Sequence, residues 1–520
     1  MILAVLHHHF RPGGVRRVIE LALPHLVAHA PKRIARVVLS AGEAPDEAWL
    51  RGIARTVSGA EVETFVHSSF GYSSEAPGSQ GNSSAAVRRG LTQLLHHCGA
   101  APLVWAHNLG LGRNVRLARE LGRLCHAGNL PLILHHHDWW FDNRWPRYAA
   151  IREAGGRTLA GLARSVLPAS PWIAHAAINE RDARLLQRHF GPRAGWLPNP
   201  VAPWPPVSRE REQAARDWLC EELGDDGPVW LLPCRLLRRK NIAEALLLTR
   251  WLRPEAWLVT TAGVSSPPEA PYAAALKHAA RTQGWRLRLA VLEREERQPP
   301  TVPELLAASE AVLLTSVQEG FGLPYLEASA AHRPLLARQL PNVAPDLAKF
   351  GFSFPQSYAE ILIAPELFDW PAERRRQERR FKAWRSQMPR AVQREVPRPA
   401  LLAAGSAPQP IPFSRLTLTA QLEVLTRPVA ESWARCAPLN PFLVAWRKRA
   451  AAGKLRATPW PRTAARWLGG RAYARRFFEL APLAPRAVPK RVDSTRVQRE
   501  LLAAKLTGDN LFPLLWHPDT

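Results

Sequence analysis

The sequence predicts an α/β protein with two doubly wound, Rossmann-like parallel-sheet domains. The chain has 520 residues, which is long enough for two or three domains. Short apolar runs alternate with helical patterns in two successive sets, as in parallel sheets joined by crossover helices. A proline cluster at 198–206 separates the sets. Because proline fixes φ and lacks an N–H donor, we expect a stiff connector and a domain boundary there.

The apolar runs predict the strands of both sheets, and the first strand leads into a helix over 16–27. In the first set the strands cover 2–6, 34–39, 62–66, 103–106, 132–134 and 165–167. In the second set they cover 229–232, 257–260, 287–291, 311–314 and 334–337. Doubly wound sheets bind ligands at the carboxyl ends of their strands, so two such halves predict a ligand cleft between those ends.

Beyond the second set, the pattern becomes helical and basic. Residues 374–398 form a charged helical run, 397–412 are rich in Pro and Ala, and 413–425 have a helical pattern. We therefore expect four segments along the chain. They are a first domain at 1–203, a second at 204–400, a linker with a helix at 401–430, and a basic, aromatic extension at 431–520.

The formal charge of +26 is the outlier of the composition. A protein this basic attracts phosphate-rich partners, such as anionic lipid, lipid-linked sugars, lipopolysaccharide or nucleic acid. No run approaches the ~20 apolar residues of a membrane span, and residues 1–6 resemble a first strand more than a signal peptide. The five cysteines are scattered without a CxxC pair, which favours neither a zinc site nor a disulfide framework. A reducing cytoplasm is the simplest compartment for them.

The most informative stretch runs from Glu319 to Glu327, with the sequence EGFGLPYLE. It follows the strand predicted at 311–314, and its glycines lead into a helix. A strand, a glycine turn and a helix in that order gather backbone N–H groups and a helix N-terminus, which bind anions. A carboxylate there would repel a phosphate, so the two glutamates are better suited to accept hydrogen bonds from hydroxyls. Phosphate and hydroxyls together indicate a nucleotide sugar. The alternative is an ordinary strand–turn–helix with two surface glutamates.

In this context the chain resembles the retaining glycosyltransferases of family 4, which have two Rossmann-like domains facing each other across a cleft, the GT-B fold. The resemblance covers about residues 1–350. It implies that Glu319 contacts the transferred sugar and that Glu327 contacts the ribose hydroxyls of the donor. It also implies a C-terminal helix that crosses back onto the first domain, for which 413–425 is the candidate. The donor-binding turn between the glutamates consists of Gly320, Phe321, Gly322 and Leu323.

A glycine pair follows the first strand. Gly13 and Gly14, in the sequence PGGV, open the first helix, and glycines there let a ligand approach the backbone closely. The family has a similar loop, so the resemblance implies that these amides face the donor diphosphate or the acceptor. A tight turn with no ligand is the alternative.

A basic motif follows the strand at 229–232. The stretch CRLLRRKN resembles the family motif G-R-L-x-x-x-K-[GN], with Cys234 in place of the usual glycine. Arg235 and Lys240 match its two cations, which would neutralise the leaving diphosphate as the glycosidic bond breaks. The alternative is a solvated basic helix start. Arg238 and Arg239 are interpreted as surface residues.

Polar side chains end the strand predicted at 132–134. The family carries a His-Asp pair at this point, and His137 and Asp138 are aligned with it, although the triple histidine at 135–137 leaves the register open by a residue or two. By resemblance, His137 would hydrogen-bond the donor sugar and Asp138 would support it. Consecutive strand residues point to opposite faces, so the three adjacent histidines cannot all ligate one ion, and no metal site is predicted. His107 and Asn108 follow the preceding strand and are candidates for acceptor contact; a core or surface role for His107 is the alternative.

The resemblance implies a hexosyltransferase (EC 2.4 type) that retains anomeric configuration. It would move mannose or glucose from a nucleotide diphosphate sugar to a saccharide, lipid-linked or envelope acceptor. The leaving phosphate oxygen would help to deprotonate the acceptor hydroxyl on the same face. Such a reaction uses no protein nucleophile and no DxD metal site, so no cofactor or metal is expected.

The C-terminal segment from Trp446 to Arg491 lies outside the resemblance. It has thirteen Lys and Arg against one acidic residue, Glu479, with aromatic residues interleaved. This pattern suits the surface of an anionic membrane, and we hypothesise peripheral association at the inner face of the membrane. The alternatives are a solvated, arginine-biased appendage and a basic protein of the same fold that binds nucleic acid or a membrane and has no transferase activity. No RNA-binding motif is visible, which makes nucleic acid the less favoured partner.

Overall fold

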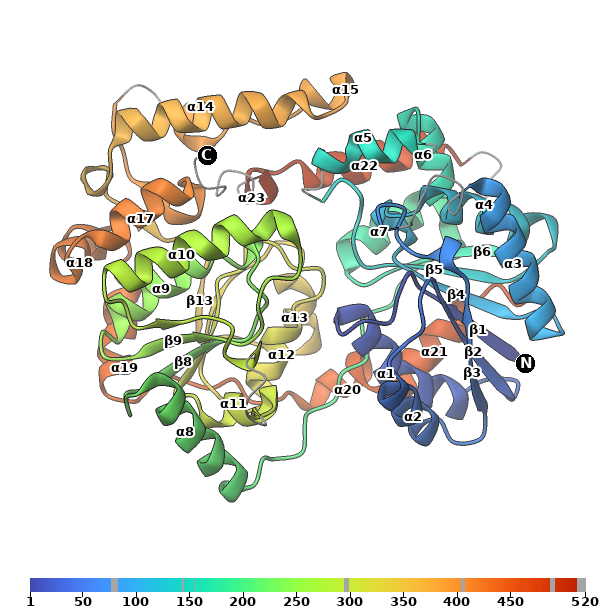
Figure 1. The fold of residues 1–520 in the computed structure, drawn as a ribbon, viewed down its shortest axis with the longest axis horizontal. Helices are drawn as coiled ribbons and strands as arrows, with labels where there is room; N and C mark the ends of the chain where they lie inside the picture. Colours follow the sequence, from blue (N-terminus) through green and yellow to red (C-terminus); the bar gives the residue numbers. More distant parts are fainter. Residues whose placement is uncertain are drawn as a thin grey trace. The chain divides into compact units, whose positions relative to one another are not determined.

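A computed structural model describes residues 1–75, 83–142, 145–154, 156–293, 299–403, 407–486 and 492–511. The chain forms two compact units, which are described separately (Figure 1). The first comprises Met1–Ala202 and Thr463–Lys505; the second comprises Pro203–Arg462 and continues from Leu506. The first division lies one residue from the boundary expected at the proline cluster.

The first unit contains a seven-stranded sheet in which every neighbouring pair is parallel. Its order is β3-β2-β1-β4-β5-β6-β7. The strands are β1 (Ile2–Leu6), β2 (Arg36–Ala41), β3 (Glu61–Val66), β4 (Leu103–His107), β5 (Leu132–His136), β6 (Ile173–Ala177) and β7 (Ala194–Trp196). The strand order reverses between β1 and β4, so the loops that follow these two strands diverge at the switch point where such sheets bind ligands.

The second unit contains a six-stranded parallel sheet of order β10-β9-β8-β11-β12-β13. Its strands are β8 (Val229–Leu232), β9 (Trp257–Thr260), β10 (Leu287–Arg288), β11 (Ala311–Leu314), β12 (Leu335–Arg338) and β13 (Gln356–Tyr358). A short antiparallel pair, β14 (Leu362–Ile363) and β15 (Ile411–Pro412), lies outside it. Two parallel α/β sheets confirm the predicted fold class.

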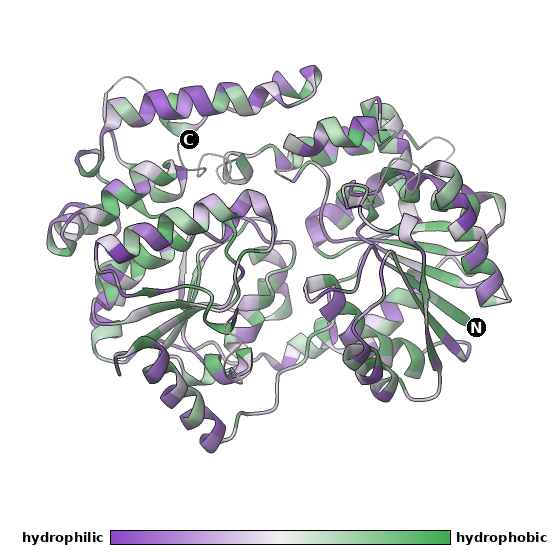
Figure 2. Cartoon of the chain, viewed as in Figure 1, coloured by the Kyte–Doolittle hydropathy of each residue, from purple (hydrophilic) through white to green (hydrophobic). Residues whose placement is uncertain are grey.

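Helices cover both sheets. Figure 2 shows that the strands are largely hydrophobic, whereas helix α14 (Trp370–Ser386) is strongly hydrophilic. In the first unit they are α1 (Gly14–Ala28), α2 (Glu47–Thr56), α3 (Ser84–Cys98), α4 (Val115–Ala127), α5 (Tyr148–Glu153), α6 (Leu159–Val166), α7 (Glu180–Phe190), α20 (Ala465–Leu468), α21 (Gly470–Leu480) and α22 (Ser494–Lys505). In the second they are α8 (Arg209–Leu223), α9 (Ile242–Leu252), α10 (Ala270–Thr282), α11 (Val302–Ala308), α12 (Leu323–Ala330), α13 (Ala344–Phe350), α14 (Trp370–Ser386), α15 (Arg390–Gln393), α16 (Ala400–Ala403), α17 (Leu418–Thr426), α18 (Val429–Cys436), α19 (Pro441–Ala451) and α23 (Gly508–Leu511). Across the described ranges, no helix has the length and apolar character to cross a membrane.

The strand expected at 165–167 is wrong. Ser165 and Val166 end helix α6 and are buried in it, and Leu167 follows as its C-cap. The sixth strand is β6, whose sequence IAHAA carries a buried histidine, His175, and is therefore a weaker apolar run. The three-residue edge strands β7 and β13 were not predicted, because such short strands leave little pattern in a sequence.

The crossover helix was also misplaced. Residues 413–425 belong to the second unit, where α17 packs against α9. The segment that returns to the first unit is Thr463–Lys505, so the residues of the extension expected at 431–520 are divided between the two units. Its helix α21 packs against α1 and buries Tyr473 and Phe477, four residues apart on one helix face. The Phe477 ring meets the Trp105 ring edge-on at 5.3 Å between centroids.

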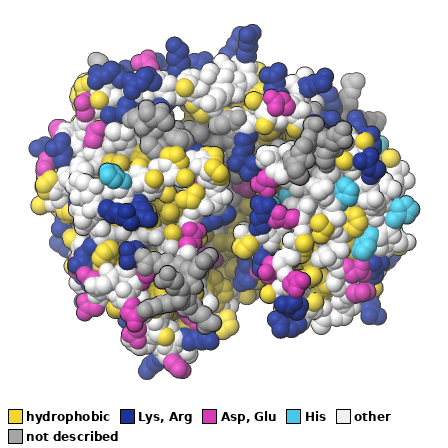
Figure 3. Space-filling model, viewed as in Figure 1, with side chains coloured by type: hydrophobic (Ala, Val, Ile, Leu, Met, Phe, Trp, Pro, Cys, Tyr) yellow, Lys and Arg dark blue, Asp and Glu magenta, His cyan; other side chains and the backbone are white. Residues whose placement is uncertain are grey.

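The aromatic residues between Trp446 and Arg486 pack into the two units. Trp446 is 5% exposed beside Tyr358, and Trp460 meets Phe352 edge-on. Trp467 contacts Trp196. Amphipathic helices with apolar faces turned inward therefore explain the interleaved aromatic and basic pattern. Residues 487–491 lie outside the described residues. Figure 3 shows Lys and Arg in scattered groups on the visible face, with several along the edge where α14 lies.

Candidate functional site

In the second unit, the loops after β8 and β11 are tied together at the carboxyl edge of the sheet. The Thr315 hydroxyl donates to the carbonyl oxygens of Lys240 and Asn241, both at 3.0 Å. The Val317 N–H donates to the Arg239 carbonyl at 2.9 Å. These bonds fix the basic motif beside the E-x7-E segment, as expected for neighbouring parallel strands.

Glu319 is the electrostatic centre of this edge. Its side chain is 9% exposed, and its carboxylate accepts from Lys240 Nζ at 2.5 Å and from Arg239 at 3.1 Å. Burial would raise the pKa of Glu319, but the positive charges of Lys240 and Arg239 hold it at about 2. The carboxylate is therefore ionised at neutral pH and accepts hydrogen bonds.

The segment between the two glutamates forms a tight turn into α12. Gly322 has a φ of +84° and caps this helix, and a β-carbon there would lie 2.6 Å from Val343 Cγ1. Both facts require glycine. Phe321 is 6% exposed, and the Asn342 amide holds the Glu319 carbonyl at 2.7 Å. The remaining members of the predicted donor site, which are all partly accessible, are Gly320, Leu323 and Glu327.

The cations of the basic motif have different surroundings. Lys240 is 7% exposed and Arg235 is exposed. Arg238 is bound to Glu269. Arg239, interpreted from the sequence as a surface residue, is partly buried and reaches both Glu319 and the Gln318 carbonyl. The run RRK gave no signal for choosing between adjacent arginines, because only the path of the loop decides which one turns inward.

In the first unit, the predicted glycine pair begins α1 directly after β1. Gly13 is the N-cap and Gly14 the first helical residue, and both are exposed. A β-carbon on Gly14 would meet no atom within 4 Å, and one on Gly13 only the Arg11 carbonyl at 3.9 Å. Packing within the chain therefore does not require glycine here. The bare backbone leaves room for a ligand at the exposed amides.

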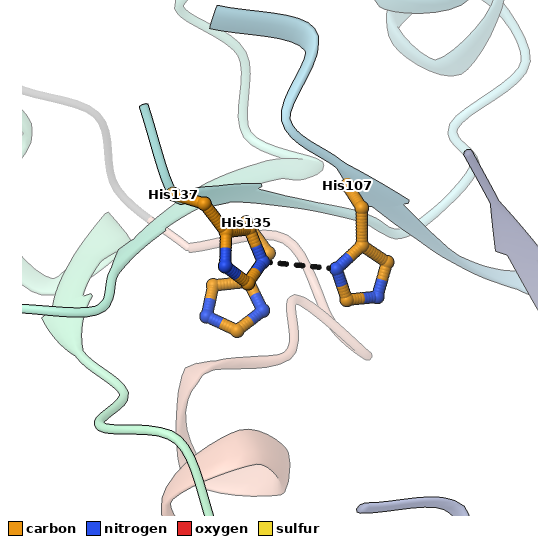
Figure 4. A group of neighbouring side chains, drawn as sticks. All are labelled: His107, His135 and His137. Atoms are coloured by element: carbon orange, nitrogen blue, oxygen red, sulfur yellow. Dashed lines mark hydrogen bonds between the residues drawn. The ribbon is translucent and has the colours of Figure 1, made fainter. Parts of the chain in front are cut away.

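The structure brings together the four polar residues predicted after β4 and β5. His107 Nδ1 and His137 Nε2 are 3.1 Å apart (Figure 4). The Asn108 amide donates to Asp138 at 3.3 Å, and the Asp138 N–H donates to Asn108 Oδ1 at 2.9 Å. Asn108 has a φ of 58°, which asparagine tolerates better than most residues. One reciprocal pair, Asn108 with Asp138, and one single hydrogen bond, between His107 and His137, thus join the ends of neighbouring strands.

These histidines are neutral. Burial lowers the pKa of His137 to about 4, against a smaller opposing effect of the Asp138 charge. The pKa of His107 is also well below its usual value, because of burial and the neighbouring histidines. His107, His135 and His136 are buried, whereas His137 and Asp138 are partly accessible. A neutral imidazole can donate one hydrogen bond and accept another, so His137 is the member of the triple histidine suited to meet a hydroxyl.

No family model matches the chain. The chain is similar to the mannosylglucosyl-3-phosphoglycerate synthase of Petrotoga mobilis, with 29% identity over 247 residues. That match covers 46% of this chain and 46% of the relative, about half of each. Among solved structures, it is similar to the N-terminal domain of Candida albicans trehalose-6-phosphate phosphatase, with a TM-score of 0.50, 9% identity, and 92% and 96% of the two chains covered. Another is Anabaena Alr3699/HepE in complex with UDP-glucose, with a TM-score of 0.47, 14% identity, and 87% and 98% covered. With its two parallel-sheet α/β units, the chain has the GT-B fold of the glycosyltransferases that it resembles.

Proposed function

We propose that this protein is a retaining glycosyltransferase of family 4 that moves a hexose from a nucleotide diphosphate sugar to a saccharide, lipid-linked or envelope acceptor. The observation that carries the proposal is the ionised Glu319 held between Lys240 and Arg239 at the carboxyl edge of the second sheet. It combines an acceptor for sugar hydroxyls with cations for phosphate. The name of the Petrotoga mobilis relative, which contains mannose and glucose, supports a hexose.

Donor binding uses the second unit. Lys240 has three N–H donors, so it can keep its bond to Glu319 and also donate to a diphosphate oxygen. Arg235, which is exposed, supplies a second positive charge, and Arg239 adds a third beside Glu319. Glu319 accepts hydrogen bonds from the transferred sugar, and Glu327 from the ribose. The exposed amides of Gly13 and Gly14 are assigned to the diphosphate or the acceptor.

In the transfer step, the bond between the anomeric carbon and the diphosphate oxygen breaks, and the acceptor oxygen bonds to the same carbon on the same face. The acceptor proton goes to the leaving phosphate oxygen. Charge develops on that phosphate, where preorganised cations are most effective. His137 hydrogen-bonds the sugar as a neutral imidazole, and Asp138 holds the Asn108 amide beside it. The proposed chemistry requires no metal.

The proposal is tested by transfer and donor-hydrolysis assays over a panel of UDP-, GDP- and ADP-hexoses, with mass spectrometry of the sugar product. We expect Lys240→Ala to abolish turnover, because it removes the buried cation nearest to Glu319. Lys277→Ala, on the exposed side of α10, is the matched control and keeps wild-type turnover. Wild-type turnover in Lys240→Ala would remove the diphosphate assignment.

A further inference from the structure

Three histidine rings converge at the carboxyl edge of the first sheet. His107 ends β4, while His135 lies in β5 and His137 follows it directly (Figure 4). One ring nitrogen from each lies within 4.8 Å of the corresponding atoms of the other two. The ring centroids of His135 and His137 are 4.4 Å apart, and each is 5.3 Å from that of His107.

Strand geometry explains why the sequence argument against a metal site was incomplete. Alternation along a strand separates His136 from its neighbours, but it places His135 and His137 on the same side. His107 is the direct partner of His135 in the register of β4 and β5. The third ligand therefore comes from the adjacent strand, and His136 turns away to pair with His175 at 3.0 Å.

Several ring nitrogens of the cluster make no hydrogen bond within the described residues. His107 Nε2 and both ring nitrogens of His135 are buried without a hydrogen-bond partner among the described residues. The Leu197 backbone approaches His135, without the geometry of a full hydrogen bond. His135 is 0% exposed, so water does not compensate. Unpaired buried polar atoms are costly and rare in folded proteins, so the His135 ring, which has no partner at either nitrogen, calls for a missing ligand.

We propose that His107, His135 and His137 form a binding site for a divalent transition-metal ion of the zinc class. Neutral imidazole nitrogens suit zinc, cobalt, nickel and copper and not magnesium or calcium. Three histidines leave the fourth tetrahedral position open. Nitrogens about 2.0–2.1 Å from one zinc ion lie about 3.4 Å apart. His107 Nδ1 and His137 Nε2, at 3.1 Å, are already near that spacing, and small ring rotations bring in His135.

The site is independent of the proposed transferase activity and goes beyond it. One consequence does rest on that activity: an ion bound to His137 removes this imidazole from the sugar. We therefore expect zinc to inhibit transfer and a chelator to restore it. The metal replaces the hydrogen bond between His107 and His137, so an ion-bound and an ion-free form exclude each other.

The test is a cobalt titration of the chelator-treated full-length protein. Cobalt in a tetrahedral nitrogen site absorbs visible light far more strongly than hexahydrated cobalt, which separates this site from weak binding at surface histidines. We expect one equivalent of intensely absorbing cobalt, displaced by one equivalent of zinc. Zinc should also raise the melting temperature of the first unit, because it binds the folded state.

Two variants decide the assignment. His135→Phe keeps a ring beside Trp105 and removes both unpaired nitrogens, so the metal-free variant should be at least as stable as wild type. We expect its cobalt affinity to fall by more than about 100-fold, since even the loss of an outer-shell partner costs about 10- to 100-fold. His96→Phe, at an exposed position, is the control and leaves binding unchanged. His137→Gln, at a partly accessible position, repeats the test if His135→Phe does not fold. Wild-type cobalt spectra in these variants, or no tetrahedral spectrum in the wild type, would overturn the proposal.

Discussion

Replacing Lys240 with methionine isolates the energy of the buried ion pair. The pKa of Glu319 is about 2 instead of 4.5. At about 1.36 kcal/mol per pKa unit, its surroundings favour the folded carboxylate by about 3 kcal/mol at neutral pH. The side chains of both partners are 9% exposed, so solvent screens the pair weakly. Arg239 remains in the variant and offsets part of the loss, so we expect Lys240→Met to cost about 2–3 kcal/mol. That corresponds to a fall of about 4–10 °C in the melting temperature of the second unit.

Differential scanning calorimetry measures this loss as a shift in the unfolding of the second unit. Lys277→Met makes the same substitution at an exposed position and should change stability by no more than about 0.5 kcal/mol. The double variant Lys240→Met/Glu319→Gln should lose less stability than the two single variants combined, since neither member of the Lys240–Glu319 pair is then left as a buried charge without the other. The stabilisation is present above about pH 4.5 and is lost as the pH falls towards 2, because the folded pKa is the lower one. An unchanged melting temperature in Lys240→Met, or strict additivity in the double variant, would refute the reasoning.

Three further predictions concern the first unit. Its free energy of unfolding, measured by calorimetry, should fall as the pH drops from about 6.5 to 4, because unfolding lets buried neutral histidines bind protons. Each such histidine should cost about 2 kcal/mol at pH 5, and a flat pH profile would contradict their burial. The pKa values lowered to about 4 by burial belong to His8, His137 and His175. Phe477→Ala should cost about 3–5 kcal/mol in chemical denaturation, whereas the exposed Arg475→Ala should cost no more than about 0.5; equal effects would argue against α21 as core. Gly14→Ala should keep wild-type stability, because its β-carbon meets nothing within 4 Å. It should weaken the binding of the donor diphosphate or the acceptor in titration calorimetry, and unchanged affinity for both would remove Gly14 from the site.

The sequence predicts the strands well where both faces of a parallel sheet are buried. Val229–Leu232 and Ala311–Leu314 are continuous apolar runs, and the structure has strands with these bounds. The strand predicted at 165–167 is wrong because the buried end of a helix, here Ser165 and Val166, has the same short pattern as a buried strand. A short apolar run does not distinguish a buried strand from a buried helix segment, and the residues that flank 165–167 do not resolve that choice.

The residues of the candidate sites also divide into those that a sequence motif locates and those that depend on the three-dimensional path of the chain. A motif with fixed spacing located Glu319 and Lys240, and the structure pairs their side chains. Arg239 was missed because its direction depends on the loop path. The convergence of His107 with His135 depends on the register between two strands, which the sequence does not contain. Helix α21, which belongs to the first unit, was missed because the family resemblance covers only about residues 1–350 and this helix lies beyond it.

The most direct test of the central claim is isothermal titration of the full-length protein with UDP, GDP and ADP, with and without Mg²⁺, at moderate salt. We expect one diphosphate to bind clearly more tightly than the others, without a requirement for Mg²⁺, and the signal to be lost in Glu327→Ala. That result would identify the base of the donor. Equal affinities that collapse as salt rises would instead mean that a chain of charge +26 attracts phosphate without a site, which contradicts the proposed nucleotide-sugar transfer.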